Sequence, residues 1–254
     1  MKNYIIVLFA LLAFSSCEEY VNSAEESVPT YLPKFEIAGE KKINLDCSPS
    51  GGFDDPGATA TESGSEIPVT TSIGGLYFAA STLDGPDIYS VNYSAVNVDG
   101  IPGVASRQIY WPACTGDFVT SISGMYTAAV FRTRISDGAT VNYSEEEFGP
   151  YWVRDAGGGK YEFSDCIGGF YDYGYGYGYE IACNGMEVTV NNIATNDVTI
   201  SGVPAVGYFG GDVAITKFKM DPVAKTISWS GEWTDYGYIF DVVLTQVDPT
   251  EFDL

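Results

Sequence analysis

Five tyrosines spaced two residues apart form the part of this sequence best suited to contact a ligand: Tyr171, Tyr173, Tyr175, Tyr177 and Tyr179. Tyrosine offers a flat apolar ring and a hydroxyl group at a small rotamer cost, which suits contact with a sugar ring or a partner protein. The carboxylates of Asp172 and Glu180 lie within or beside the run and could accept hydrogen bonds from ligand hydroxyl groups. The run therefore predicts a ligand-binding surface with rings at its centre.

The conformation of this run decides which way its rings face. In an extended chain all the rings would share one face, because strand side chains alternate with a period of two. Glycine weakens strands and permits positive φ, so the alternative is a loop folded over between two strands. These strands are expected at 170–173 and 180–183. In that loop the rings either stay exposed to a ligand or pack on their own domain as a plug.

This sequence contains few residues of the types that commonly catalyse reactions. There is no histidine, which excludes histidine-based triads and histidine-containing zinc sites. Paired carboxylates can hydrolyse glycosidic bonds, and the acidic residues that border the tyrosine run are Asp165, Asp172 and Glu180. Charged residues beside a loop are usually solvated, so we expect a protein without enzymatic activity and without a cofactor.

The acidic residues of the first half are better explained as turn residues than as metal ligands. Asp54, Asp55 and Asp99 lie close to glycine or proline, where aspartate stabilises turns. Together with Asp84 and Asp87 they could offer oxygen ligands to calcium, but their spacing lacks the alternation of a calcium-binding loop. We therefore expect no bound metal.

The start of the chain has the layout of an exported lipoprotein. Residues 1–16 contain Lys2, an apolar run too short to span a bilayer and small residues at the end, as in a secretory signal peptide. The sequence Leu-Ala-Phe-Ser-Ser-Cys at 12–17 resembles a bacterial lipobox, which implies cleavage before Cys17 and acylation of its thiol. An ordinary secreted protein cut near the same place is the alternative.

The residues after Cys17 and the charge of the chain bear on its partners. Glu18 and Glu19 resemble the export signal that sends Bacteroidetes lipoproteins to the outer face of the outer membrane, with residues 17–30 as a lipidated tether. The lipid anchor would then be the only contact with the membrane. The formal net charge of −22 argues against nucleic acid as a partner, because phosphate binding needs clusters of basic residues.

From Tyr31 onward the sequence predicts an all-β fold. Short runs rich in β-branched and aromatic residues, one of them at 76–80, alternate with turn residues, and no segment has a sustained helical period. The length favours two domains, at 31–114 and 115–254. Meandering hairpins such as those of the second domain make a β-barrel or a β-sandwich.

Two hairpins have clear turn chemistry. The run 88–96 is expected to pair with 106–111 across Val98-Asp99-Gly100. The second hairpin turns at Asp221-Pro222, and its returning strand is expected to carry the following residues on one face: Ile227, Trp229 and Trp233.

Cysteine usage fits an oxidising compartment. With Cys17 committed to lipid, the remaining cysteines are even in number, which allows two disulfides. Pairing Cys47 with Cys114 and Cys166 with Cys183 keeps each bridge inside one domain. Burial as free thiols is the alternative.

The first domain resembles the bacterial immunoglobulin-like domains of cell-surface proteins. The resemblance rests on Phe53 to Ala60, Gly64, Ile67-Pro68-Val69, Tyr89 to Ala95, Asn97, Asp99-Gly100 and Arg107. It implies an immunoglobulin-like sandwich that acts as a spacer and holds another domain away from the membrane.

The second domain resembles the C-terminal domain of small Bacteroidetes surface lipoproteins encoded with outer-membrane receptors of the starch-utilisation type. The matching pieces are Ser123-Gly124-Met125-Tyr126, Tyr161 to Asp165, Gly168 to Tyr171, the Tyr-Gly repeat and the hairpin from Asp221-Pro222 to Trp229. The resemblance implies capture of glycans or another nutrient at the cell surface, and it supplies no binding residues.

Three functions remain open from the sequence. A surface lipoprotein could bind a neutral polysaccharide or oligosaccharide through its aromatic residues, since so acidic a protein should prefer a neutral ligand. It could instead be a structural or partner-binding subunit of outer-membrane receptor proteins, or a barrel that holds a lipid in its mouth. If the tyrosines do not contact the ligand, Trp229 and Trp233 are the next candidates.

Overall fold

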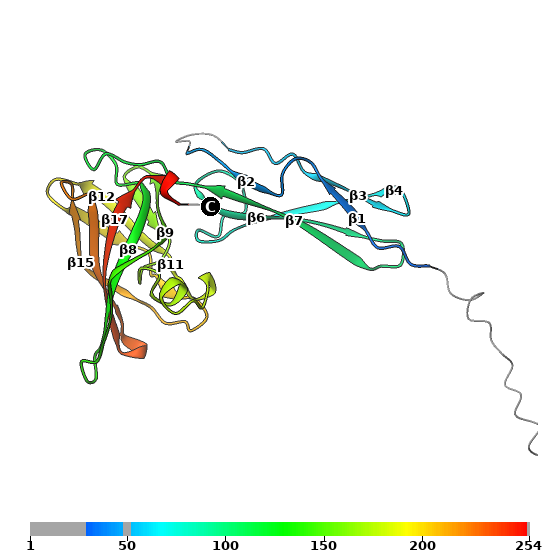
Figure 1. The fold of residues 1–254 in the computed structure, drawn as a ribbon. Helices are drawn as coiled ribbons and strands as arrows, with labels where there is room; N and C mark the ends of the chain where they lie inside the picture. The colour runs from blue at the N-terminus through cyan, green and yellow to red at the C-terminus, as the bar shows by residue number, and fades with distance from the viewer. Residues whose placement is uncertain (1–28, 48–51, 253–254) are drawn as a thin grey trace, which may run out of the picture.

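The chain forms two β-rich modules that lie end to end (Figure 1). The computed structural model describes residues 29–47 and 52–252, so the predicted signal peptide, Cys17 and most of the tether lie outside the described residues. The N-terminal module has its strands within 34–111 and the C-terminal module within 124–247. The predicted all-β fold is confirmed. Among the described residues no helix is both long and apolar enough to cross a membrane.

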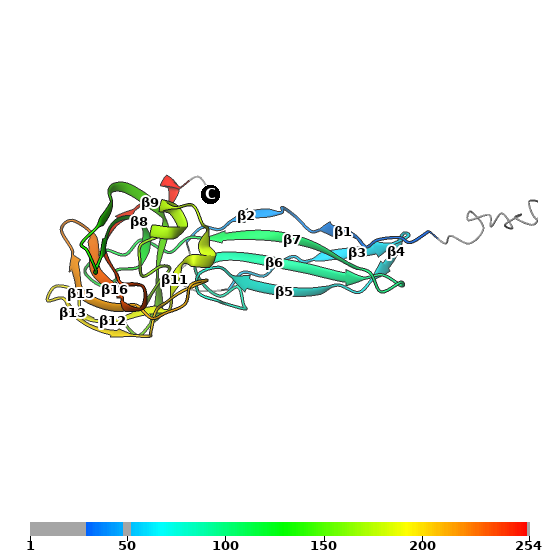
Figure 2. The ribbon, with the colours of Figure 1, turned by 90° about the horizontal axis from the view of Figure 1, so that it is seen from below.

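The N-terminal module contains two sheets around one core. Its strands are β1 (Lys34–Ile37), β2 (Lys42–Asn44), β3 (Ala58–Glu62), β4 (Ser65–Ile67), β5 (Thr70–Gly75), β6 (Asp87–Val96) and β7 (Pro102–Trp111). One sheet has the order β1-β3-β4 and the other β2-β7-β6-β5, with β2 parallel to β7 and the other neighbours antiparallel. The pairing of β6 with β7 confirms the predicted hairpin, whose strands run the length of the module (Figure 2).

Alternation along β6 explains how this core forms. Tyr89, Val91 and Tyr93 are buried on one face of the strand, where they meet side chains of both sheets. The buried guanidinium of Arg107 forms an ion pair with Asp55, and the hydroxyl of Tyr93 donates to the same carboxylate at 2.7 Å. Asp55 lies in the loop before β3, so it ties that loop to the neighbouring strands β6 and β7 as a structural partner of a tyrosine and an arginine.

The C-terminal module is built on one strongly curved antiparallel sheet. Its strands are β8 (Gly124–Arg134), β9 (Thr140–Gly157), β10 (Lys160–Phe163), β12 (Met186–Asn192), β13 (Asp197–Ser201), β15 (Ala214–Asp221), β16 (Thr226–Trp233) and β17 (Tyr238–Val247). Their order is β13-β12-β10-β9-β8-β17-β16-β15, and the separate strands β11 (Cys183–Asn184) and β14 (Ala205–Val206) pair with each other. The backbone N–H of Met220 in β15 donates to the side chain of Asn196 beside β13, so the two edges approach and the sheet is nearly closed.

The interior of this barrel-like sheet is filled by its own side chains. Ile227, Trp229 and Trp233 are buried together on one face of β16, as the sequence predicted, and β15 pairs with β16 across the Asp221-Pro222 turn. Trp229 packs edge-on against Phe163, with ring centroids 5.6 Å apart. Both tryptophans are therefore core residues, and neither offers a ring to a ligand.

Three predicted strands are wrong. Residues 76–80 form no strand. The buried carboxylate of Asp87 accepts the backbone N–H groups of Tyr77 and Phe78, at 3.0 and 3.1 Å, in place of a neighbouring strand. Residues 170–173 and 180–183 do not form strands either, apart from Cys183, which begins β11. Two short helical turns replace them, the π-helical η1 (Phe170–Gly174) and η2 (Tyr179–Ile181). Two further short turns lie elsewhere, η3 (Thr234–Tyr236) and η4 (Pro249–Glu251).

An aromatic contact joins the two modules. The indole of Trp152 in β9 lies 5.2 Å from the ring of Tyr77 and 5.3 Å from that of Tyr110, measured between centroids. Its Nε1 donates to the carbonyl oxygen of Trp111 at 3.1 Å. These contacts are buried, so they favour a fixed relative orientation of the modules.

Candidate binding surface

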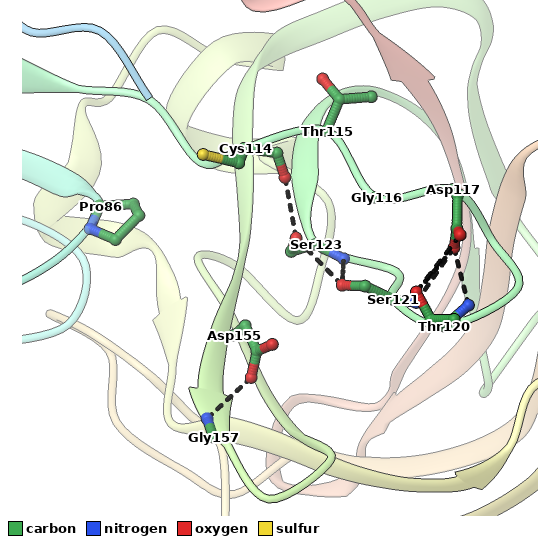
Figure 3. Close-up of a pocket in the computed structure, with 10 residues that line it drawn as sticks. All are labelled: Pro86, Cys114, Thr115, Gly116, Asp117, Thr120, Ser121, Ser123, Asp155 and Gly157. Atoms are coloured by element: carbon green, nitrogen blue, oxygen red, sulfur yellow. Dashed lines mark hydrogen bonds between the residues drawn. The ribbon is translucent and has the colours of Figure 1, made fainter. Parts of the chain in front are cut away.

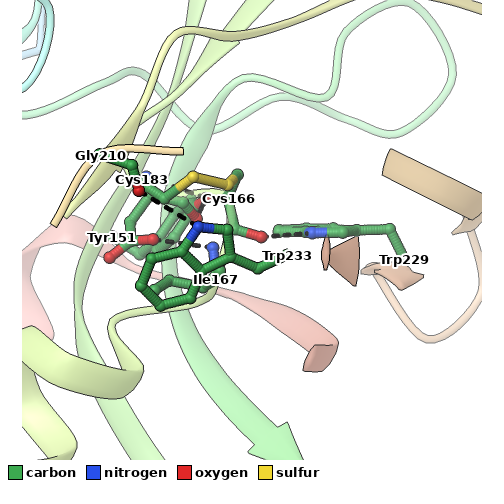
Figure 4. The surroundings of a disulfide bond; sticks show 8 residues. Tyr151, Cys166, Ile167, Cys183, Gly210, Trp229 and Trp233 are labelled. Atoms are coloured by element: carbon green, nitrogen blue, oxygen red, sulfur yellow. Dashed lines mark hydrogen bonds between the residues drawn. A yellow bond between two sulfur atoms is a disulfide. The ribbon is translucent and has the colours of Figure 1, made fainter. Parts of the chain in front are cut away.

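The tyrosine segment, residues 170–181, lies on the side of the barrel-like sheet that faces the N-terminal module (Figures 1 and 2). The disulfide Cys166–Cys183 joins its two ends, and the backbone N–H of Cys166 donates to the carbonyl oxygen of Cys183 at 2.8 Å. Trp229 Nε1 donates to the carbonyl oxygen of Cys166 at 2.7 Å (Figure 4). The base of the segment is thus fixed to the core. The structure also contains the disulfide Cys47–Cys114.

The first rings of the segment point inward. Phe170 is fully buried, with its ring centroid 5.3 Å from that of Phe240 in β17. Tyr171 is only 8% exposed and packs edge-on against Trp233. The structure therefore removes Tyr171 from the predicted set of ligand contacts, because its ring is part of the core.

Tyr173 also faces the protein, at the junction of the modules. Its hydroxyl donates to the carbonyl oxygen of Pro150 at 2.8 Å and lies 3.2 Å from the hydroxyl of Tyr77. Burial raises the pKa of Tyr173 well above its usual value. Tyr173 is therefore an interface residue, and the prediction that it contacts a ligand is wrong.

The later tyrosines form the exposed part of the segment. Tyr175, Tyr177 and Tyr179 are exposed, with Tyr177 at 56%. The rings of Tyr175 and Tyr177 stack with centroids 5.5 Å apart, and Tyr177 lies nearly parallel to buried Tyr171 at 6.3 Å. The rings of Tyr175 and Tyr177 are thus layered on a ring of the core, which holds them in a defined arrangement.

A second loop, missed by the sequence reasoning, extends this surface. Tyr208 is 81% exposed and Phe209 and Tyr236 are also exposed. Phe209 lies 6.1 Å from both Tyr171 and Tyr236, measured between ring centroids. We name the exposed rings together the aromatic surface: Tyr175, Tyr177, Tyr179, Tyr208, Phe209 and Tyr236.

Close backbone contact attaches this loop to the tyrosine segment. The backbone N–H of Tyr208 donates to the carbonyl oxygen of Glu180 at 2.9 Å. A Cβ at Gly207 would lie 2.0 Å from that oxygen, so only glycine fits there. The sequence signal was an aromatic pair, Tyr208-Phe209, between glycines.

The predicted carboxylates divide between the interior and the surface. Asp165 is buried, and burial raises its pKa to about 7, although the backbone N–H of Ile167 donates to it at 2.8 Å. Burial also raises the pKa of Asp172, an effect that the nearby hydroxyl of Tyr77 partly offsets. Glu180 alone is exposed beside the aromatic surface. A buried Asp165 cannot reach a glycosidic bond.

A separate pocket of about 590 Å³ lies where the modules meet (Figure 3). Its polar side chains bond to their own loop: Ser123 Oγ donates to the carbonyl oxygen of Cys114 at 2.8 Å, and Asp155 accepts the backbone N–H of Gly157 at 2.7 Å. Asp117 accepts the backbone N–H groups of Val119 and Thr120. These groups are already satisfied, so the pocket has less to offer a ligand than the aromatic surface.

No cluster of metal-binding side chains occurs within 29–47 or 52–252. Three of the five aspartates considered for calcium have partners in the protein. Asp87 accepts three backbone N–H groups, Asp84 accepts the hydroxyl of Thr82, and Asp55 pairs with Arg107.

Comparison with known proteins places the C-terminal module in a family. The model of the BT2262-like C-terminal domain matches residues 115–246. The crystal structure of the lipoprotein BT2262 from Bacteroides thetaiotaomicron is similar at 24% sequence identity, with a TM-score of 0.52 over 85% of this chain and 100% of that chain. This likeness bears on the fold alone. The comparison with curated proteins found no match.

Proposed function

This chain belongs to the BT2262-like family through its C-terminal domain, and we propose that it is a cell-surface lipoprotein that binds glycans without catalysis. The observation that carries the proposal is the aromatic surface, where Tyr175 and Tyr177 stack over a buried ring above a disulfide-bonded base. Sugar rings offer apolar C–H faces that pack on such aromatic rings. They also carry hydroxyl groups, which can donate hydrogen bonds to the carboxylate of Glu180.

Preorganisation supports this function. Tyr175 and Tyr177 are held by ring stacking, and the backbone N–H of Tyr177 donates to the carbonyl oxygen of Tyr171 at 3.0 Å. Side chains already fixed in the free protein lose little conformational entropy on binding. The interior of the barrel-like sheet, in contrast, is occupied by core residues such as Phe163 and Trp229, so it supports a lipid-holding function poorly.

The start of the sequence and the relative both support membrane attachment. The lipobox-like residues before Cys17 support acylation of its thiol, and the relative BT2262 is itself a lipoprotein. We infer an outer-membrane location facing outward, with the N-terminal module as an immunoglobulin-like spacer. A Cys17→Ala variant should leave the membrane fraction, and equal membrane retention would contradict the anchor.

A second candidate function is binding of an outer-membrane receptor protein. It is favoured by the aliphatic tip of the N-terminal module, where Val96, Val98, Ile101 and Val104 are exposed together around the β6–β7 turn. Contiguous exposed apolar side chains often mark protein contacts. Co-purification of a receptor with the parent, and its loss with Val98→Ser/Ile101→Ser, would support this role.

Calorimetric titration against a panel of polysaccharides tests the main proposal. The triple variant Tyr175→Ala/Tyr177→Ala/Tyr179→Ala should bind about tenfold to a thousandfold more weakly, at roughly 0.5 to 1.5 kcal/mol per stacked ring. Tyr31→Ala is the matched control, because Tyr31 is an exposed tyrosine of the other module. No binding of any polysaccharide by the parent would contradict the proposal.

A further inference from the structure

One arginine next to the aromatic surface has no acidic partner. The described residues contain ion pairs for Arg107, Arg134 and Arg154, with Asp55, Asp137 and Glu162 respectively. Arg132 forms no ion pair within the described part of the chain. With 34 acidic residues in the sequence, an unpaired guanidinium is unexpected, because the protein could readily have placed a carboxylate beside it.

Aromatic rings surround this guanidinium instead. Its Cζ lies 4.5 Å from the ring centroid of Tyr238, 4.7 Å from that of Phe170 and 5.9 Å from that of Tyr175. Cation–π contacts of this kind hold a guanidinium in place without neutralising it. The plane of the cation is therefore fixed while its charge stays available.

Most of the hydrogen-bonding capacity of Arg132 is unused. Nη1 donates to the hydroxyl of Tyr171 at 3.3 Å, and Nε is buried without a partner among the described residues. A guanidinium has five N–H donors arranged to bind the two oxygens of a carboxylate or a sulfate. An incoming anion would meet the charge and the remaining Nη N–H groups, which are not among the buried unpartnered atoms.

Position connects Arg132 with the ligand rings. Arg132 lies on β8 with its side chain partly exposed, and it touches both Tyr171 and Tyr175 of the ring stack. A ligand group seated on Tyr175 would thus lie beside the guanidinium. The high negative charge of the whole protein is screened beyond about 8 Å at physiological ionic strength, so the local arginine decides what binds there.

We propose that the ligand of the aromatic surface is an acidic glycan, whose carboxylate or sulfate group binds Arg132 while its sugar rings stack on the exposed tyrosines. This inference rests on the proposed glycan-binding function. The net charge of the protein predicted a neutral ligand. The unpaired guanidinium of Arg132 instead favours an acidic one.

Matched polysaccharides separate charge from ring stacking. Polygalacturonate is compared with its methyl ester, and dextran sulfate with dextran, so that each acidic probe has a neutral counterpart. Titration calorimetry should show the parent binding at least one acidic probe about tenfold to a hundredfold more tightly than its counterpart, as expected for hydrogen bonds to a charged group. The pair that shows the preference tells carboxylate from sulfate.

Variants then assign the preference to one side chain. Arg132→Gln should abolish the preference for the acidic probe, and Arg132→Lys should reduce it because lysine lacks the planar fork. Arg134→Gln is the matched control, two residues along the same strand and already paired with Asp137. If Arg132→Gln does not fold, the comparison of the parent with Arg132→Lys still tests whether Arg132 causes the preference for the acidic probe.

Distinct outcomes contradict the two proposals. Tight binding of neutral probes with no acidic preference, or an acidic preference unchanged in Arg132→Gln, would overturn the role of Arg132 and leave glycan binding intact. Absence of binding to every probe would overturn glycan binding itself, and the acidic-ligand inference with it.

Discussion

The tyrosine segment has an inner half, residues 170–173, and an outer half, residues 175–179, which share one residue type and one spacing but have opposite surroundings. In the inner half Tyr171 packs in the core and Tyr173 bonds across the module junction. In the outer half Tyr175 and Tyr177 stack in solvent. The same repeat therefore supplies both the foundation of a surface and the surface itself.

Glycines explain why the halves differ. A Cβ at Gly168 would lie 2.7 Å from a methyl group of Val130, and one at Gly169 would lie 2.5 Å from the ring of Tyr173. These two glycines, just before the inner half, are thus needed for close approach as well as for their positive φ of +66° and +73°. At Gly176 and Gly178 a Cβ would meet nothing within 4 Å, but φ is +66° and +87°. There glycine is needed for chain direction, which turns the outer rings away from the core.

Removing an inner ring should have the largest effect on stability. Tyr171→Ala would leave a cavity beside Trp233 and Phe240 and should lower the free energy of unfolding by about 3 to 5 kcal/mol. Tyr177→Ala is the matched change in the outer half, with an expected effect below about 0.5 kcal/mol. Urea denaturation of the two variants measures the difference, and equal losses would abolish the distinction between the halves.

Burial of Asp165, just before the tyrosine segment, should make the stability of its base depend on pH. The pKa of Asp165 is raised from 3.8 to about 7 by burial, so the folded protein binds more protons than the unfolded chain between those pH values. Stability should therefore fall as pH rises from about 4 to about 7, by up to roughly 4 kcal/mol from this group.

Asp165→Asn tests this origin of the pH dependence. The amide still offers an oxygen to the backbone N–H of Ile167 but cannot ionise, so the decline between pH 4 and pH 7 should become much shallower. Some decline should remain, because burial also raises the pKa of Asp87 and Asp172. Unfolding free energies at several pH values give the slopes, and parallel curves for parent and variant would refute the assignment.

Opening the disulfide should affect both halves at once. Cys166 and Cys183 are 17 residues apart, and closing a loop of that size contributes about 3 kcal/mol in the chain-entropy description. Cys166→Ala/Cys183→Ala should lower the unfolding free energy by about that amount and weaken ligand binding, since the outer rings lose their fixed base. An unchanged melting temperature would show that the segment does not depend on the bridge.

Local chemistry made part of this structure predictable from sequence. The hairpins at Asp99-Gly100 and Asp221-Pro222 and the buried face of β16 are set by turn residues and by alternation within a few residues. Exposure of Tyr175 to Tyr179 was among the alternatives that the repeat left open.

Contacts between distant residues account for what the sequence did not reveal. The inward turn of Tyr171 depends on Trp233 and Phe240, and the bend at 76–80 depends on the carboxylate of Asp87. The Tyr208-Phe209 loop joins the surface only through its backbone contact with Glu180. None of these contacts follows from periodicity, because each requires the folded barrel or the module junction.

Affinity and stability measured together on one outer-half variant test the central claim most directly. Tyr175→Ala/Tyr177→Ala/Tyr179→Ala should keep the melting temperature of the parent within a few degrees, because the three rings are exposed. Its affinity for the polysaccharide that the parent binds should fall by at least about tenfold, as expected for the loss of stacked rings. A folded triple variant that binds as tightly as the parent would contradict the assignment of ligand binding to the outer half.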